Sequence, residues 1–164
     1  ELRGTLEGLA ARFAAERGAS ARSLEPLKEC LGDLDQLVRQ DPISVEAFSA
    51  YVTMNARFHA LLNELSASAP LIREIDRVSA LPFASPSAFV MAQSALPEAH
   101  QILLLGQDHH RIVVDAIENR EGARAEAVMR EHSRLAARNL RLAIRNRTHL
   151  ELMPALALLK SSAE

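Results

Sequence analysis

Apolar side chains recur along this chain at intervals of three and four residues, and this period constrains the fold more than any other feature. On an α-helix that spacing places the apolar residues on one face, which must be buried against a neighbour. Signals for strands are nearly absent: β-branched clusters are few and no Asn-Gly turn occurs. Short connections make successive helices antiparallel neighbours. We therefore predict an all-α antiparallel bundle of six to seven helices, built by one domain over residues 1–164.

Serines and glycines mark the ends of the predicted helices. Ser23 and Ser44 are the expected N-caps of two helices, and Gly18 is an expected C-terminal stop. The stripe on the first helix consists of Leu2, Leu6, Leu9, Ala10 and Phe13. The predicted helices cover about residues 1–17, 23–40, 44–65, 70–79, 88–119 with a break at Pro97, and 120–146, followed by a short apolar tail over 151–159.

Composition excludes several classes of protein. Hydrophobic residues make up 48% and charged residues 24%, which is typical of a folded globular domain. The net charge of −2 argues against a domain that grips nucleic acid through a large basic face. The aliphatic run over 102–105 is far shorter than the ~20 residues that cross a bilayer, so no membrane is expected. Cys30 is the single cysteine, which suits a reducing compartment, and we expect a cytoplasmic protein.

Three histidines fall on the apolar faces of three different predicted helices. His59 lies four residues after Asn55, so both occupy the inner face of one helix. His110 and His132 lie on the apolar stripes of two later helices. A buried neutral imidazole needs partners for both nitrogens, and a lone one finds a carbonyl or a water. Three imidazoles can instead hold one zinc or nickel ion. The spacing leaves both interpretations open: satisfied core histidines or one shared metal site.

Motifs for other chemistry are missing from the sequence. It contains no His-Glu-x-x-His, no glutamate three residues before a histidine, and no glycine-rich phosphate loop. We expect no carboxylate on an inner stripe with the three histidines, which argues against a zinc enzyme because such an enzyme needs a general base. Arg3 is either a surface cation or a fork for a carboxylate. The arginines at 134, 138, 141 and 145 are expected on a solvated face.

Four segments, in order along the chain, resemble one known pattern. Together they resemble the FadR-type C-terminal ligand-binding domain (FCD) of GntR-family transcription regulators. The segments are Glu1-Leu2-Arg3-Gly4-Thr5-Leu6-Glu7-Gly8-Leu9-Ala10-Ala11, Asn55-Ala56-Arg57-Phe58-His59, His110-Arg111-Ile112-Val113-Val114-Asp115-Ala116-Ile117, and Ala127-Val128-Met129-Arg130-Glu131-His132.

The resemblance implies a sensor rather than an enzyme. It implies that His59, His110 and His132 line a central cavity and hold a divalent metal, zinc or nickel, with Asn55 at the fourth ligand position. A small organic acid would bind at the open positions of the metal, and Arg3 is the candidate for binding its carboxylate. It also implies a homodimer and a winged-helix DNA-binding domain that precedes residue 1.

One residue departs from the family's pattern. The family's usual aspartate is Asn55 here, which offers a carbonyl oxygen but no charge. The charge of the ion would then be uncompensated, which lowers metal affinity and strengthens attraction for an anion. A metal-free cavity that binds the effector directly is therefore an alternative. Two further alternatives are a dimerisation or scaffold bundle with satisfied core histidines, and a three-histidine zinc enzyme.

Overall fold

A computed structural model describes residues 1–41, 43–81, 84–87 and 99–145 of the chain. Within these residues there are six helices and no strand. This confirms the predicted all-α class. The helices are α1 (Leu2–Arg17), α2 (Ala21–Val38), α3 (Val45–Leu65), α4 (Ala69–Ser79), α6 (Ala99–Glu118) and α7 (Gly122–Arg145).

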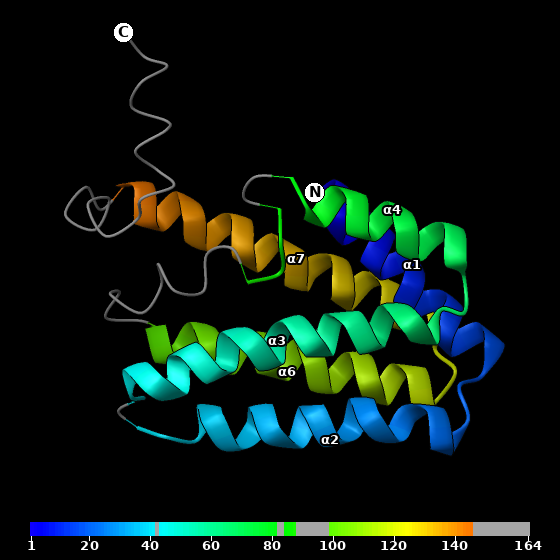
Figure 1. The fold of residues 1–164 in the computed structure, drawn as a ribbon, viewed down its shortest axis with the longest axis horizontal. Coiled ribbons are helices and arrows are strands. Elements are labelled where there is room, and N and C mark those ends of the chain that lie inside the picture. The colour runs from blue at the N-terminus through cyan, green and yellow to red at the C-terminus, as the bar shows by residue number, and fades with distance from the viewer. Residues whose placement is uncertain (42, 82–83, 88–98, 146–164) are drawn as a thin grey trace, which may run out of the picture.

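The helices form an antiparallel bundle in which α1 has the most neighbours (Figure 1). The helix pairs α2–α3 and α6–α7 each run antiparallel, as the colours in Figure 1 show. Helix α2 packs against both α3 and α6, whereas α1 contacts α3, α4, α6 and α7. A side chain that points inward from α1 therefore lies near three of the longest helices. None of the described helices is long and apolar enough to cross a bilayer.

Local sequence explains where several helices begin and end. Ser44 caps α3 as predicted, with its hydroxyl accepting a hydrogen bond from the Ala47 amide at 3.1 Å. Gly18 ends α1 with φ 77°, a left-handed conformation that glycine adopts without a Cβ penalty. The predicted cap of α2 was wrong: Ser20 is the N-cap, and it accepts from the Ser23 amide at 3.1 Å. Helix α2 therefore begins earlier than predicted, because the earlier of the two serines has the extended backbone that a cap requires.

The predicted apolar stripes of the central helices form the core. Phe48, Phe58 and Leu62 of α3 are at most 2% exposed. The stripe of α2 is buried as well, with Cys30 among its members. The remaining large members of this core are Leu24, Leu27, Leu34, Val38, Tyr51, Leu103, Val113, Val114, Ile117 and Met129.

The predicted inner face of α1 was wrong for Leu2 and right for Ala10. Leu2 is 60% exposed, whereas Ala10 is fully buried, and Leu6, Leu9 and Phe13 are partly buried and pack with it beside α4. The remaining buried residues of α1 are small or polar: Arg3, Gly4, Glu7, Gly8, Ala11, Ala14 and Ala15. Small residues occupy this face because they let α7 approach closely. A Cβ added at Gly4 would lie 2.5 Å from the Ser133 Cβ.

Several sequence predictions fall on residues that the structure does not describe. These are the break at Pro97, the tail over 151–159 and the side chains of Arg141 and Arg145. The side chains of Arg134 and Arg138 are exposed, as expected for a solvated face.

Candidate metal centre

The three histidines predicted to point inward meet at one place in the bundle. His59 comes from α3, His110 from α6 and His132 from α7, and one ring nitrogen of each lies within 4.8 Å of those of the other two. His59 and His110 are buried, and His132 is partly exposed. The centroids of the His110 and His132 rings are 4.4 Å apart, and that of His59 lies 5.6 Å and 5.3 Å from them. The arrangement is a compact cluster of imidazoles, as three ligands of one ion would require.

A carboxylate holds the His59 ring. Nδ1 of His59 lies 3.0 Å from Oε1 of Glu7, which is fully buried on α1. A carboxylate only accepts, so Nδ1 carries a hydrogen, and in the neutral ring Nε2 carries the lone pair. Nε2 is buried and has no hydrogen-bond partner among the described residues. A buried acceptor without a partner is costly, and a metal ion at this point would satisfy it.

An amide holds the His110 ring in the same manner. Nδ1 of His110 lies 3.0 Å from Oε1 of Gln107, one turn earlier on α6. Nε2 of His110 lies 3.2 Å from Nε2 of His132. If His110 carries its hydrogen on Nδ1, then His132 donates across that contact in the metal-free protein. The ring of Phe58 lies 4.1 Å from the His110 ring, centroid to centroid, and covers it.

The protonation of the cluster suits a cation. Burial holds the pKa of His110 well below its ordinary value, and the neighbouring His132 and His59 lower it further. Burial likewise lowers the pKa of His132 well below its ordinary value, followed by the effects of His59 and Arg3. Both rings are therefore neutral near pH 7, which is the form that binds a metal ion.

Glu7 is the functional residue that the sequence interpretation missed. We expected no carboxylate on an inner stripe with the histidines, and this expectation was wrong. Burial alone would raise the pKa of Glu7, but His59 and Arg3 outweigh it and lower the pKa, so the side chain is ionised. A signal existed in the sequence, since Glu7 lies between Gly4 and Gly8 on the small-residue face of its helix.

Both oxygens of Glu7 have partners. Oε1 accepts from His59, and Oε2 pairs with the Arg3 guanidinium and lies 3.5 Å from the Ser133 hydroxyl. Such a carboxylate orients a ligand rather than abstracting a proton. Glu7 is therefore not a general base. The argument against a zinc enzyme, which rests on the lack of such a base, is unchanged.

Arg3 lies at the site rather than on the surface. It is only 9% exposed, and its ion pair with Glu7 links it to His59. The pair is neutral as a whole, so it does not compensate the charge of an ion at the histidines. A guanidinium has five N–H donors, and the contact with Glu7 uses only some of them. Arg3 can therefore bind a second carboxylate.

Asn55 is buried on α3, one turn before His59. Its amide nitrogen donates to the Ser87 hydroxyl at 3.1 Å, and that hydroxyl donates to the Val52 carbonyl at 2.9 Å. This network fixes the amide, and the carbonyl oxygen is the atom that could bind a metal.

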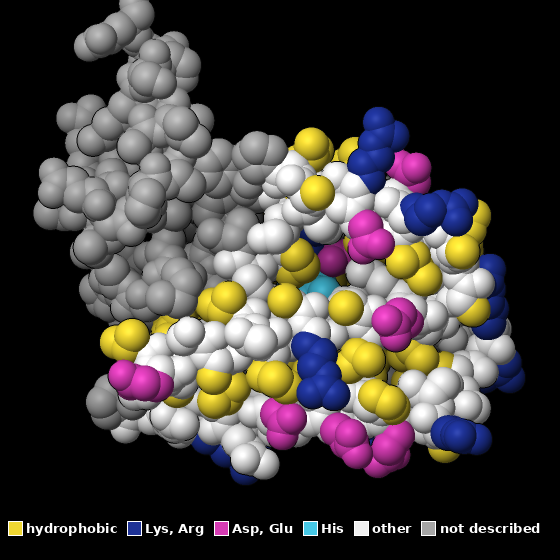
Figure 2. Space-filling view, in the orientation of Figure 1, with side chains coloured by type: hydrophobic (Ala, Val, Ile, Leu, Met, Phe, Trp, Pro, Cys, Tyr) yellow, Lys and Arg dark blue, Asp and Glu magenta, His cyan; other side chains and the backbone are white. Residues whose placement is uncertain are grey.

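A cleft of about 440 Å³ borders the site without containing the histidines. It lies between the first turn of α1 and α7, and Ser133, which reaches Glu7, is part of its wall. Figure 2 shows a separate hollow between α3 and α4, with histidine and acidic atoms at its floor. The histidine-lined cavity that the resemblance implies stays a prediction. The cleft is lined by Glu1, Gly4, Thr5, Arg130, Glu131, Ser133, Arg134, Leu135, Ala137 and Arg138.

The fold and the histidine cluster define an all-α domain with a centre suited to a divalent metal. The family model described as FCD domain matches residues 1–135, and the chain belongs to this family. The FCD domain is the C-terminal domain of GntR-family regulators, a ligand-sensing and non-catalytic regulatory domain. A comparison with curated proteins found no match.

Proposed function

We propose that this domain senses a small organic acid at a divalent metal, zinc or nickel, held by His59, His110 and His132. The observation that carries the proposal is the meeting of three imidazoles from three helices, with the buried Nε2 of His59 lacking any partner among the described residues. Satisfied core histidines would not leave that acceptor bare.

The residues around the cluster prepare it for a metal. Glu7 and Gln107 each contact Nδ1 of one ring, which leaves Nε2 of His59 and of His110 as the atoms available to a metal. The Asn55 oxygen, one turn before His59, is the proposed fourth ligand atom. When bound, the ion supplies a Lewis acid to which a carboxylate can coordinate.

Charge favours an anionic ligand. Three neutral imidazoles and Asn55 contribute no negative charge, and the Arg3–Glu7 pair is neutral as a whole. An ion here would keep its charge of +2, and the remaining N–H groups of Arg3 would add a hydrogen-bonding fork. A small carboxylate satisfies both features, so we propose it as the effector.

The proposed context is a longer regulator. In it a winged-helix DNA-binding domain precedes residue 1, and two copies form a homodimer. Effector binding at the metal would favour one arrangement of the bundle over another and so change the geometry of the DNA-binding domains. DNA would be bound only through that additional domain, in keeping with the net charge of −2.

Calorimetric titration tests the proposal. Tag-free protein is stripped with a chelator, half is reloaded with zinc, and both forms are titrated with mono-, di- and tricarboxylates. We expect at least one carboxylate to bind the zinc form more tightly, and the difference to vanish in His132→Ala. Equal binding to both forms would support the metal-free cavity instead. If no carboxylate binds either form, the proposed function is wrong.

A further inference from the structure

Gln107 connects the histidine cluster to helix α2, which contributes no histidine to it. The side chain is fully buried on α6. Its Nε2 donates to the Asp35 carboxylate at 2.6 Å and to the Leu31 carbonyl at 3.2 Å, both on α2. Its Oε1 lies 3.0 Å from Nδ1 of His110.

These contacts fix the orientation of the amide. The reverse orientation would place Oε1 against two acceptors, the Asp35 carboxylate and the Leu31 carbonyl, and would lose both hydrogen bonds. With Nε2 turned towards α2, the group facing His110 is a carbonyl oxygen, which only accepts. The hydrogen of the neutral His110 ring must therefore be on Nδ1.

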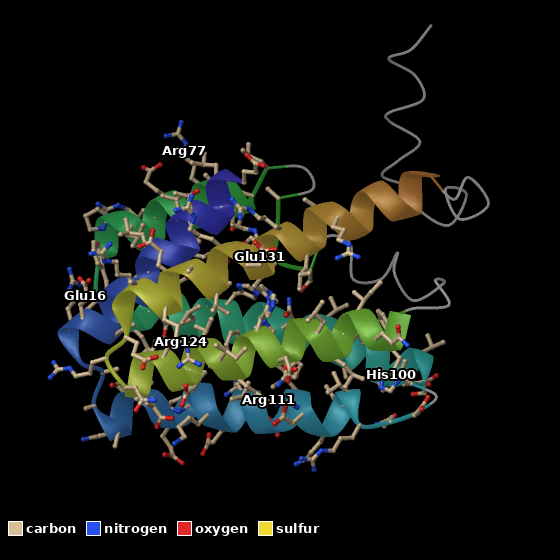
Figure 3. The ribbon with its side chains drawn as sticks, turned by 180° about the vertical axis from the view of Figure 1, so that it is seen from behind. Glu16, Arg77, His100, Arg111, Arg124 and Glu131 are labelled. Carbon is tan, nitrogen blue, oxygen red and sulfur yellow. The ribbon has the colours of Figure 1, made fainter. Side chains whose placement is uncertain are left out.

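An ion pair at the surface holds the other end of this chain of hydrogen bonds. Arg111 contacts Oδ1 of Asp35 through Nε at 3.1 Å and through an Nη atom at 2.8 Å, and it also pairs with Asp108 at 2.6 Å. Figure 3 shows Arg111 where α6 lies along α2. Asp35 is thus held in the position in which it accepts from Gln107.

From this geometry we propose that Gln107 is a positioning residue. It fixes His110 in the Nδ1–H tautomer and so presents the Nε2 lone pair to the centre of the cluster. The tautomer follows from the hydrogen bonds of this chain alone, whereas its consequence for metal affinity rests on the proposed function. A purely structural role for Gln107, joining α2 to α6, would leave the tautomer unchanged when the residue is replaced.

The tautomer can be read directly in metal-free protein. Two-bond ¹H–¹⁵N spectra at pH 8, where the ring is neutral, distinguish Nδ1–H from Nε2–H imidazole. We expect His110 of the unmodified protein to show the Nδ1–H pattern. Gln107→Leu removes the acceptor, so the pattern should change to Nε2–H, with the Nε2 of His132 as the new acceptor.

A second variant separates positioning from packing. Gln107→Glu keeps an oxygen that accepts from Nδ1 of His110 but removes the amide N–H groups that bind Leu31 and Asp35 on α2. It should keep the Nδ1–H pattern although the link between α2 and α6 is weakened. Lys28→Ala is the matched control, because Lys28 joins α2 to Glu118 of α6 at 2.9 Å away from the cluster. It should leave the His110 signals unchanged.

Zinc affinity measured by competition gives the second result. We expect Gln107→Leu to weaken zinc binding about 10- to 100-fold, the usual effect of losing such a partner, and Gln107→Glu to retain most of it. An Nε2–H pattern in the unmodified protein would overturn the proposal without any variant. An unchanged tautomer in Gln107→Leu would do the same. If the tautomer changes as expected but no form binds zinc, Gln107 keeps its positioning role and the proposed function fails.

Discussion

The Glu7 carboxylate on α1 accepts a hydrogen bond from Nδ1 of His59 on α3, with 3.0 Å between the two atoms. Both residues are at most 1% exposed. This contact joins the helix that carries Arg3 to the histidine cluster, and it leaves Nε2 of His59 directed at the centre without a partner among the described residues.

Replacing Glu7 should destabilise the folded protein. Glu7→Ala leaves Arg3 buried without its anion and removes the acceptor of His59, so we expect a loss of about 3 kcal/mol or more in the free energy of unfolding. Urea denaturation measures it. Glu16→Ala on the same helix is the control, because its ion pair with Arg12 is about half exposed and should change stability by at most about 0.5 kcal/mol. Equal effects of the two substitutions would contradict the account of Glu7.

Replacing two glycines by alanine should change stability in opposite directions, because only Gly4 lies where α1 and α7 approach closely. In Gly4→Ala the new Cβ would meet the Ser133 side chain at 2.5 Å, and we expect destabilisation of about 1–3 kcal/mol. Gly32 lies within α2, and nothing lies within 4 Å of an added Cβ there. Gly32→Ala should therefore stabilise by about 0.5–1 kcal/mol through helix propensity. Thermal unfolding of both variants checks the pair, and a neutral Gly4→Ala would show that the two helices are not in close contact.

The buried histidines predict a dependence of stability on pH. Burial lowers the pKa of His110 and of His132 in the folded state. Below pH ~6.5 the unfolded chain binds protons at these two positions while the folded protein does not. The metal-free protein should therefore lose up to about 1.4 kcal/mol per pH unit for each of the two as the pH falls below that point.

Unfolding midpoints of the metal-free protein between pH 8 and pH 5 test this expectation. In His132→Gln one of the two contributions is removed, so the slope below pH ~6.5 should be smaller. The lowered pKa of Glu7 acts in the same direction but only in more acidic solution, below about pH 4.5. A slope that is identical in the variant and in the unmodified protein would contradict the lowered pKa of His132.

Replacing Arg3 should weaken the binding of the effector more than the binding of the metal. Arg3→Lys keeps a cation beside Glu7 but loses the planar fork that binds a carboxylate through two hydrogen bonds. We expect about a tenfold loss in carboxylate affinity of the zinc-loaded protein, equivalent to about 1.4 kcal/mol, and little change in zinc affinity. Calorimetry measures both. Should zinc affinity fall while carboxylate affinity holds, Arg3 acts through Glu7 and not on the effector.

The helical period was enough to predict the class, most helix ends and the inward direction of three histidines, whereas their meeting at one place was implied only by the family resemblance. Each of the first three depends on residues that face the core of their own helix, which spacing reveals. The side of α1 that faces the bundle centre was misassigned because α1 is covered on two sides, by α4 over Leu6 and Leu9 and by α7 over its glycines. The sequence shows that α1 has a leucine face and a glycine face, but it does not show which of the two packs more closely against another helix.

Glu7 and Gln107 were missed for a related reason. A charged or amide side chain on a helix is ordinarily assigned to solvent, and its burial depends on partners that are distant in sequence. For Glu7 these are His59 and Ser133, and for Gln107 they are Leu31 and Asp35. The local signals were the position of Glu7 between Gly4 and Gly8, one helical turn from Arg3, and the position of Gln107 one turn from His110.

The central claim is that three imidazoles from three helices hold one metal ion, and X-ray absorption at the zinc edge of tag-free protein tests it most directly. We expect one zinc per chain, with three histidine nitrogens at about 2.0–2.1 Å. Zinc should be lost in His132→Ala and retained in His109→Ala, which alters the neighbouring histidine of α6 outside the cluster. Zinc content below one per chain after reloading, or a spectrum without histidine ligands, would contradict the account.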